Sequence, residues 1–197
     1  MFDSFLKFVK LGTDHIVNFN DYDHILFVII FSIPFMFKDW KRLLVLITLF
    51  TLGHTLSLML GAYDIVDLNI NVTSWLIPLT IFFAALYNIF TAGRPIKNRI
   101  YLIYTIILFF GFIHGLAYTN TFLGVVSSDE NVFISIIEFA IGIEIGQLII
   151  VVAVLILNFI FQSIFRFSNR DWVLVISSIL LGLISVSYTH LTLPTIR

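Results

Sequence analysis

The chain has 197 residues, of which 59% are apolar and 12% charged, and its formal net charge is −1. Soluble domains are nearer one half apolar and one quarter charged, so this composition predicts an integral membrane protein with no water-soluble domain left over. The near-zero charge excludes a basic surface for nucleic acid, and the absence of cysteine excludes disulfides, thiolate metal ligands and a cysteine nucleophile.

The segment 1–19 predicts a short amphipathic helix that lies at the membrane surface. Its charged residues fall away from one apolar stripe, which consists of Phe2, Phe5, Leu6, Val9 and Ile16. The segment lacks the basic start and the small-residue cleavage site of a signal peptide.

Six apolar stretches follow, at 22–37, 43–62, 74–92, 100–124, 131–165 and 172–190. A helix needs about 20 residues to cross the hydrocarbon core, so each stretch is a candidate span. The first is short unless it begins among Asp21 to His24, and the fifth is long enough to tilt. We therefore predict an all-α, polytopic transmembrane bundle of about six spans plus the N-terminal interfacial helix, in a single transmembrane domain over 1–185.

The connecting loops alternate in charge. Basic residues follow the first, third and fifth spans, whereas the other two loops carry Asp64, Asp67, Asp129 and Glu130 without lysine or arginine. The positive-inside rule places the basic loops in the cytoplasm, so both termini are expected outside.

The C-terminal residues are unlike the rest of the chain. Val186 to Leu191 resembles a sequencing-library adaptor read in one frame, and Thr192 to Arg197 is equally atypical. We expect 186–197 to be a non-native tail, in which His190 has no functional meaning. The alternative is that 186–197 is a native polar tail on the outer side of the membrane.

His24, His54, His114 and Glu144 each lie in a different apolar stretch, where an ionisable side chain is costly and suggests function. Counted from the nearest basic loop, the three histidines lie roughly 21, 18 and 22 Å from the inner boundary. They therefore share one slab in the outer half of the membrane. Glu144 lies at roughly 21 or 33 Å, depending on whether the count starts at Asn158 or Arg166.

Further polar residues accompany these four. Gln147 shares a helix face with Glu144, while Glu138 projects about 120° away from it. His15 and Asp23 precede the first span and could act at the outer mouth or behind the ligands. Simpler interpretations are a solvated helix start for Asp23, helix packing for Glu138, and mutual hydrogen bonding for buried histidines.

Five segments, in order, resemble the HupE/UreJ family of small bacterial membrane proteins. They are Leu11-Gly-Thr-Asp-His-Ile, Tyr22-Asp-His-Ile-Leu-Phe, Phe50-Thr-Leu-Gly-His-Thr-Leu-Ser, Phe110-Gly-Phe-Ile-His-Gly-Leu-Ala and Gly142-Ile-Glu-Ile-Gly-Gln. The family is associated with hydrogenase and urease accessory functions, and some members are regarded as nickel or cobalt permeases. The resemblance implies a multi-pass protein of the bacterial cytoplasmic membrane. Its matched positions are His15, Asp23, His24, His54, His114 and Glu144.

The leading hypothesis is a permease for a divalent transition metal, with His24, His54, His114 and Glu144 as metal ligands. Imidazole and carboxylate suit nickel, cobalt or zinc, and affinity alone does not choose among them. The expected partners are the lipid bilayer and the metal ion, with homo-oligomerisation left open. One alternative is an intramembrane zinc-dependent hydrolase, in which Glu144 is a general base. Another is a non-catalytic accessory protein.

Overall fold

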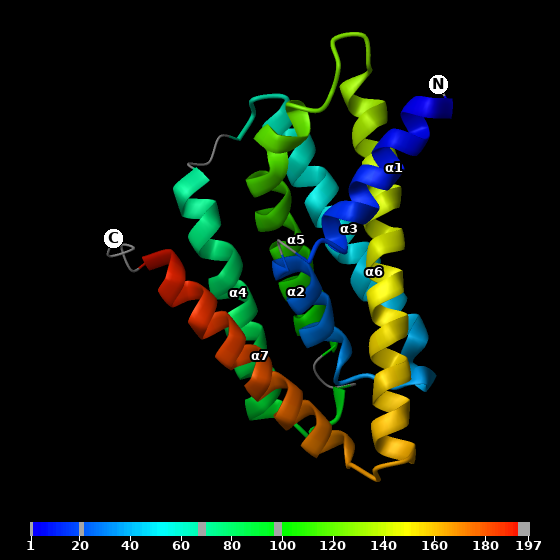
Figure 1. Cartoon of the computed structure of the whole chain (residues 1–197), viewed down its shortest axis with the longest axis vertical. Coiled ribbons are helices and arrows are strands. Elements are labelled where there is room, and N and C mark those ends of the chain that lie inside the picture. The colour runs from blue at the N-terminus through cyan, green and yellow to red at the C-terminus, as the bar shows by residue number, and fades with distance from the viewer. Residues whose placement is uncertain (1, 20–21, 67–69, 97–99, 193–197) are drawn as a thin grey trace.

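The computed structural model describes residues 2–19, 22–66, 70–96 and 100–192, and all regular structure in these ranges is helical (Figure 1). The side chains of 70–74 and 187–192 are outside this description. The elements are α1 (Phe2–Ile16), α2 (Asp23–Ser32), the 3₁₀ turn η1 (Phe37–Asp39), α3 (Trp40–Ala62), α4 (Ile70–Thr91), α5 (Ile100–Leu123), α6 (Val132–Ser163) and α7 (Asn169–Thr192). The predicted all-α class is confirmed.

Four stretches of the described chain are long and apolar enough to cross a membrane. They are Phe37–Ala62, Ile100–Leu123, Val132–Ser163 and Asn169–Val186. Shorter apolar helices occur at Asp23–Ser32 and Trp75–Thr91, the part of α4 whose side chains are described. The fold is thus that of a membrane protein, and the predicted count of six spans stays a prediction.

The first two helices follow one another along the height of the molecule. α1 descends against the N-terminal half of α6, and α2 begins near mid-height and continues toward the opposite end (Figure 1). α2 has 10 residues and is therefore only about 15 Å long, too short to cross alone. The two helices thus follow one another along the bundle, with a break in the helix between Ile16 and Asp23.

Glycines bring two pairs of helices into close contact. A Cβ on Gly53 of α3 would lie 2.2 Å from the Leu108 carbonyl oxygen of α5, and one on Gly111 would lie 2.2 Å from that of Phe50. Likewise, a Cβ on Gly142 of α6 would lie 2.1 Å from the Val9 carbonyl oxygen of α1. Small residues permit this approach of helix backbones in membranes. As a result, α1 packs into the bundle, whereas the sequence predicted it at the membrane surface.

The connections divide by charge between the two ends of the molecule. Those joining α2 to α3, α4 to α5 and α6 to α7 lie at one end, and those joining α3 to α4 and α5 to α6 at the other (Figure 1). The first group carries basic residues together with one carboxylate, Asp39, whereas the second carries acidic residues and no lysine or arginine. At the acidic end, Asn131 caps α6 by accepting a 3.2 Å hydrogen bond from the Ile134 amide.

Candidate metal centre

Four histidines from four helices meet inside the bundle. The ring of His24 lies 4.3 Å from that of His15 and 5.0 Å from that of His114, measured between centroids. The ring of His54 lies 5.9 Å from that of His15. The expected convergence of His24, His54 and His114 is therefore present, and it occurs at the break between α1 and α2.

Three of these histidines form an arrangement that could hold a metal ion. His15, His24 and His54 each offer a ring nitrogen, and these three atoms lie within 4.8 Å of one another. His24 and His54 are buried, and no described residue hydrogen-bonds to either ring nitrogen of these two side chains. Burial of a polar group without a hydrogen-bond partner lowers the stability of the fold. Such unpaired nitrogens therefore indicate that a ligand binds here.

His114 is oriented differently from the other three. Its Nδ1 lies 2.8 Å from the Phe110 carbonyl oxygen, and a neutral imidazole satisfies this contact by donating the Nδ1 proton. In that tautomer the buried Nε2 carries the lone pair, and no described residue hydrogen-bonds to it. A backbone acceptor on one ring nitrogen is the usual way of orienting the other toward a metal. His114 therefore lies beside the triad with a free donor atom.

His15 lies inside the cluster, whereas the sequence predicted it at the entrance or behind the ligands. It reaches this place because α1 packs on α6 through Gly12, Gly142 and Gly146. The ring of Tyr118 lies 3.9 Å from that of His15 and provides one wall. The signal that could have revealed this position is the small-residue spacing Gly142-x-x-x-Gly146, which indicates a close helix partner.

Glu144 is not placed at the histidine triad. Its Oε1 accepts a 2.6 Å hydrogen bond from Thr48 of α3, and Gln147 Oε1 accepts one of 3.0 Å from Thr51. Thr48, Thr51 and His54 follow one another along α3 over about 9 Å. The predicted ligand Glu144 thus belongs to a polar row that leads from His54 toward the basic end of the molecule.

The remaining predicted site residues, Glu138 and Asp23, do not belong to the group of side chains whose ligand atoms lie within 4.8 Å of one another. Glu138 is buried in α6, and no described residue hydrogen-bonds to its Oε2. Asp23 is half-buried in the first turn of α2, directly before His24. A carboxylate at a helix N-terminus is favourable to the helix dipole, which agrees with the structural role considered for Asp23.

Apolar rings surround the cluster. Phe139 lies 5.7 Å from the ring of His15 and 6.0 Å from that of His54, while Phe50 lies 5.6 Å from that of His114. Phe50 and Phe139 are both buried. Because the local dielectric is low, electrostatic interactions with a bound cation are stronger here than in water.

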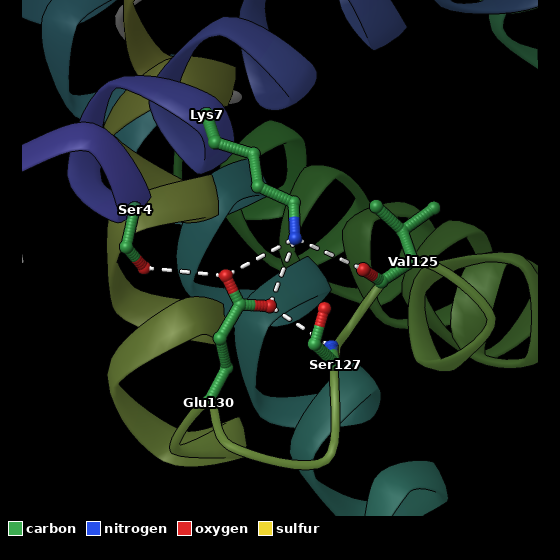
Figure 2. Close-up of polar contacts among 5 residues, drawn as sticks. All are labelled: Ser4, Lys7, Val125, Ser127 and Glu130. Carbon is green, nitrogen blue, oxygen red and sulfur yellow. Dashed lines mark hydrogen bonds and ion pairs between the residues drawn. The ribbon is translucent and has the colours of Figure 1, made fainter.

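An ion pair at the acidic end fixes the start of α1 (Figure 2). Lys7 Nζ donates to both carboxylate oxygens of Glu130, at 3.1 and 2.8 Å, and to the Val125 carbonyl oxygen at 3.1 Å. The hydrogen bond from Lys7, followed by that from the Ser127 amide, lowers the pKa of Glu130. This clamp ties α1 to the loop before α6 and so helps to hold His15 in the cluster.

The sequence profile of a family described as HupE / UreJ protein matches residues 1–192. Searches of curated proteins and of solved structures found no match.

Proposed function

We propose that this chain, which belongs to the HupE/UreJ family, is a membrane permease that binds a divalent transition metal ion as its substrate at the histidine cluster. The family is associated with nickel or cobalt transport and with accessory roles. The observation that carries the proposal is the meeting of His15, His24 and His54 within 4.8 Å, from three separate helices. His114 is proposed as the fourth imidazole.

The donor set suits nickel, cobalt or zinc. Imidazole is a good ligand for all three ions, and the order of affinities is similar at most such sites. Neutral imidazoles leave the bound ion with its full charge, so anionic groups nearby favour occupancy. Asp23 lies next to His24 in sequence, and Glu144 lies along the polar row below His54.

The break between α1 and α2 supports a transport role. In many transporters, discontinuous helices place helix ends at the substrate site, and the negative C-terminal ends favour cations. Here α1 ends at Ile16, directly after His15, and α2 begins at Asp23, directly before His24. The break therefore brings two ligands together at mid-height, beside the negative end of α1 and the positive end of α2, and the Asp23 carboxylate offsets the latter.

The polar row on α3 and α6 supports an inward route. A permease needs polar groups between its site and the cytoplasm, and the sequence alone offered few of them. The pairs Thr51–Gln147, which is buried, and Thr48–Glu144, which is exposed at the edge of the interface, supply such groups on the side of His54 that faces the basic end. The proposed path runs along this interface from the histidines to the cytoplasm.

Uptake into proteoliposomes tests the proposal. Vesicles containing wild-type protein are expected to accumulate nickel or cobalt, whereas H54A vesicles are expected to match empty ones. E144Q is expected to bind the ion at the cluster but to transport it more slowly, because the carboxylate belongs to the path. Stoichiometric binding without uptake would contradict transport and favour the zinc-dependent hydrolase. Absence of binding would favour the accessory role.

A further inference from the structure

Two cavities lie side by side at the basic end of the molecule. One has a volume of about 380 Å³ and is lined by residues of the loops and helix ends. The other has a volume of about 450 Å³ and is lined mainly by aromatic and aliphatic side chains. They share a wall, made of Pro34, Tyr87, Asn88 and Ile103. Both volumes are in the usual range of ligand pockets.

The first cavity is strongly cationic. Lys38, Arg42, Arg94 and Arg170 line it, against the single carboxylate of Asp39. Asp39 is paired with Arg42 at 2.7 Å, and the lining as a whole carries four cationic side chains against one carboxylate, which gives a formal net charge of +3. Guanidinium and ammonium groups are the usual protein donors to phosphate.

This cavity lies at the level of the bundle where a lipid headgroup would be located. Its cationic residues lie where α3 begins, where α4 ends and where α7 begins. These helix ends mark the boundary between the apolar spans and the basic connections. Basic pockets between transmembrane helices on the cytoplasmic side are typical binding sites for anionic lipid headgroups.

The second cavity extends from the first toward the hydrocarbon. Its lining includes Phe31, Phe35 and Phe110 on one side, and Phe83 and Phe90 of α4 on the other. Phe83 and Phe90 are 56% and 72% exposed, so this side of α4 faces lipid. Asn88 in the shared wall is itself fixed, because its Nδ2 donates a 2.5 Å hydrogen bond to the Ile30 carbonyl oxygen.

We propose that the two cavities together bind one anionic phospholipid, with its phosphate among the cations of the first and an acyl chain in the second. Charge complementarity selects the anionic headgroup, and the shared wall joins it to an apolar chain. A free phosphate ion would use the first cavity alone. The proposal requires that the helices span a membrane and is independent of metal transport, since neither cavity is lined by a histidine.

Native mass spectrometry of the purified full chain tests this proposal. The probes are phosphatidylglycerol, phosphatidylcholine with the same acyl chains, and glycerol 3-phosphate. Phosphatidylglycerol is expected to bind more tightly than phosphatidylcholine, and R170Q is expected to weaken its binding about fivefold or more. The matched control is R166Q, which removes the same charge four residues earlier, in the connection between α6 and α7, at a position that does not line the cavity. It is expected to leave binding unchanged.

A second pair of variants tests the apolar cavity. A84L and L86W each add volume to its wall, and both are expected to weaken phosphatidylglycerol binding while leaving glycerol 3-phosphate unaffected. Two positions are used so that one misfolded variant does not decide the outcome. Equal binding of the two phospholipids, or equal losses in R170Q and R166Q, would overturn the proposal. So would glycerol 3-phosphate binding as tightly as phosphatidylglycerol with no effect of the filling variants.

Discussion

The burial of a histidine at position 54 is not explained by its contribution to the stability of the fold. It is 0% exposed, and no described residue hydrogen-bonds to either of its ring nitrogens. A buried polar side chain without partners lowers stability, and active sites commonly retain such groups because function requires them. We therefore expect this imidazole to destabilise the metal-free bundle.

The substitution H54L separates ligand binding from packing. Leucine retains most of the buried volume and removes the unsatisfied nitrogens, so the thermal midpoint of the metal-free protein is expected to stay the same or to rise. The increase in midpoint caused by nickel is expected to disappear, with a loss of affinity of at least about 100-fold. Thermal unfolding with and without the ion measures both. A lower midpoint in metal-free H54L would assign His54 a structural role.

The depth of a side chain along its own helix could be predicted from the sequence, but the contacts between side chains of different helices could not. The helical rise placed His24, His54 and His114 in one slab, and their rings do converge. The same arithmetic gave two depths for Glu144, because it could not fix where the long α6 meets the membrane boundary. The packing of α1 on α6 brings His15 into the cluster, and the amphipathic pattern of the sequence does not reveal this packing.

The contact between α1 and α6 positions His15 without any direct bond to it. Gly142 allows the α1 backbone to approach, since a Cβ there would lie 2.1 Å from the Val9 carbonyl oxygen and 2.9 Å from the Thr13 amide nitrogen. These are backbone atoms and cannot rotate away, so the helix itself must move. Thr13 Oγ1 also donates a 3.1 Å hydrogen bond to the Gly142 carbonyl oxygen.

The substitution G142A is therefore expected to displace α1 and weaken metal binding. The cost of overpacking is about 1–3 kcal/mol, and the loss of affinity should follow from the displacement of His15. G182A in α7 is the matched control, because a Cβ at Gly182 meets no atom within 4 Å. Isothermal titration with nickel compares the two. Equal affinities in G142A and G182A would show that the close approach of α1 does not matter for the site.

The Lys7–Glu130 clamp predicts a response to acid. Because the ion pair lowers the pKa of Glu130, its stabilising effect is present above about pH 4.3, the usual value for glutamate. The effect is lost as the pH falls through the lower pKa of the folded state. The midpoint of thermal unfolding should therefore fall more steeply with acid in wild type than in K7A. Parallel curves for the two proteins would contradict this role of the clamp.

The whole molecule carries its basic connections at one end, and we propose that this end faces the cytoplasm. In the same proposal residues 1–185 form a single transmembrane domain, and both termini lie outside. The suspected foreign tail, 186–197, lies almost entirely beyond the side chains that the structure describes. The alternation of basic and acidic connections between the two ends could be predicted from the sequence, because it depends on the order of the helices along the chain and not on how they pack.

Single cysteines test the orientation, because the natural chain has none. S128C in the acidic connection before α6 and S163C at the end of α6 are both exposed positions. In intact cells with a permeable outer layer, a membrane-impermeant maleimide is expected to label S128C but not S163C. Disruption of the membrane should make both reactive. Labelling of S163C alone in intact cells would reverse the proposed orientation.

X-ray absorption spectroscopy of the nickel-loaded protein examines the metal site itself. The scattering of imidazole rings is distinctive, and the structure predicts one ion per chain bound by at least three histidine nitrogens at about 2.0–2.1 Å, by analogy with other first-row ions. The predicted ligands are His15, His24 and His54, joined by His114. A spectrum with at most one imidazole per ion would contradict a shared site and leave the histidines as packing residues.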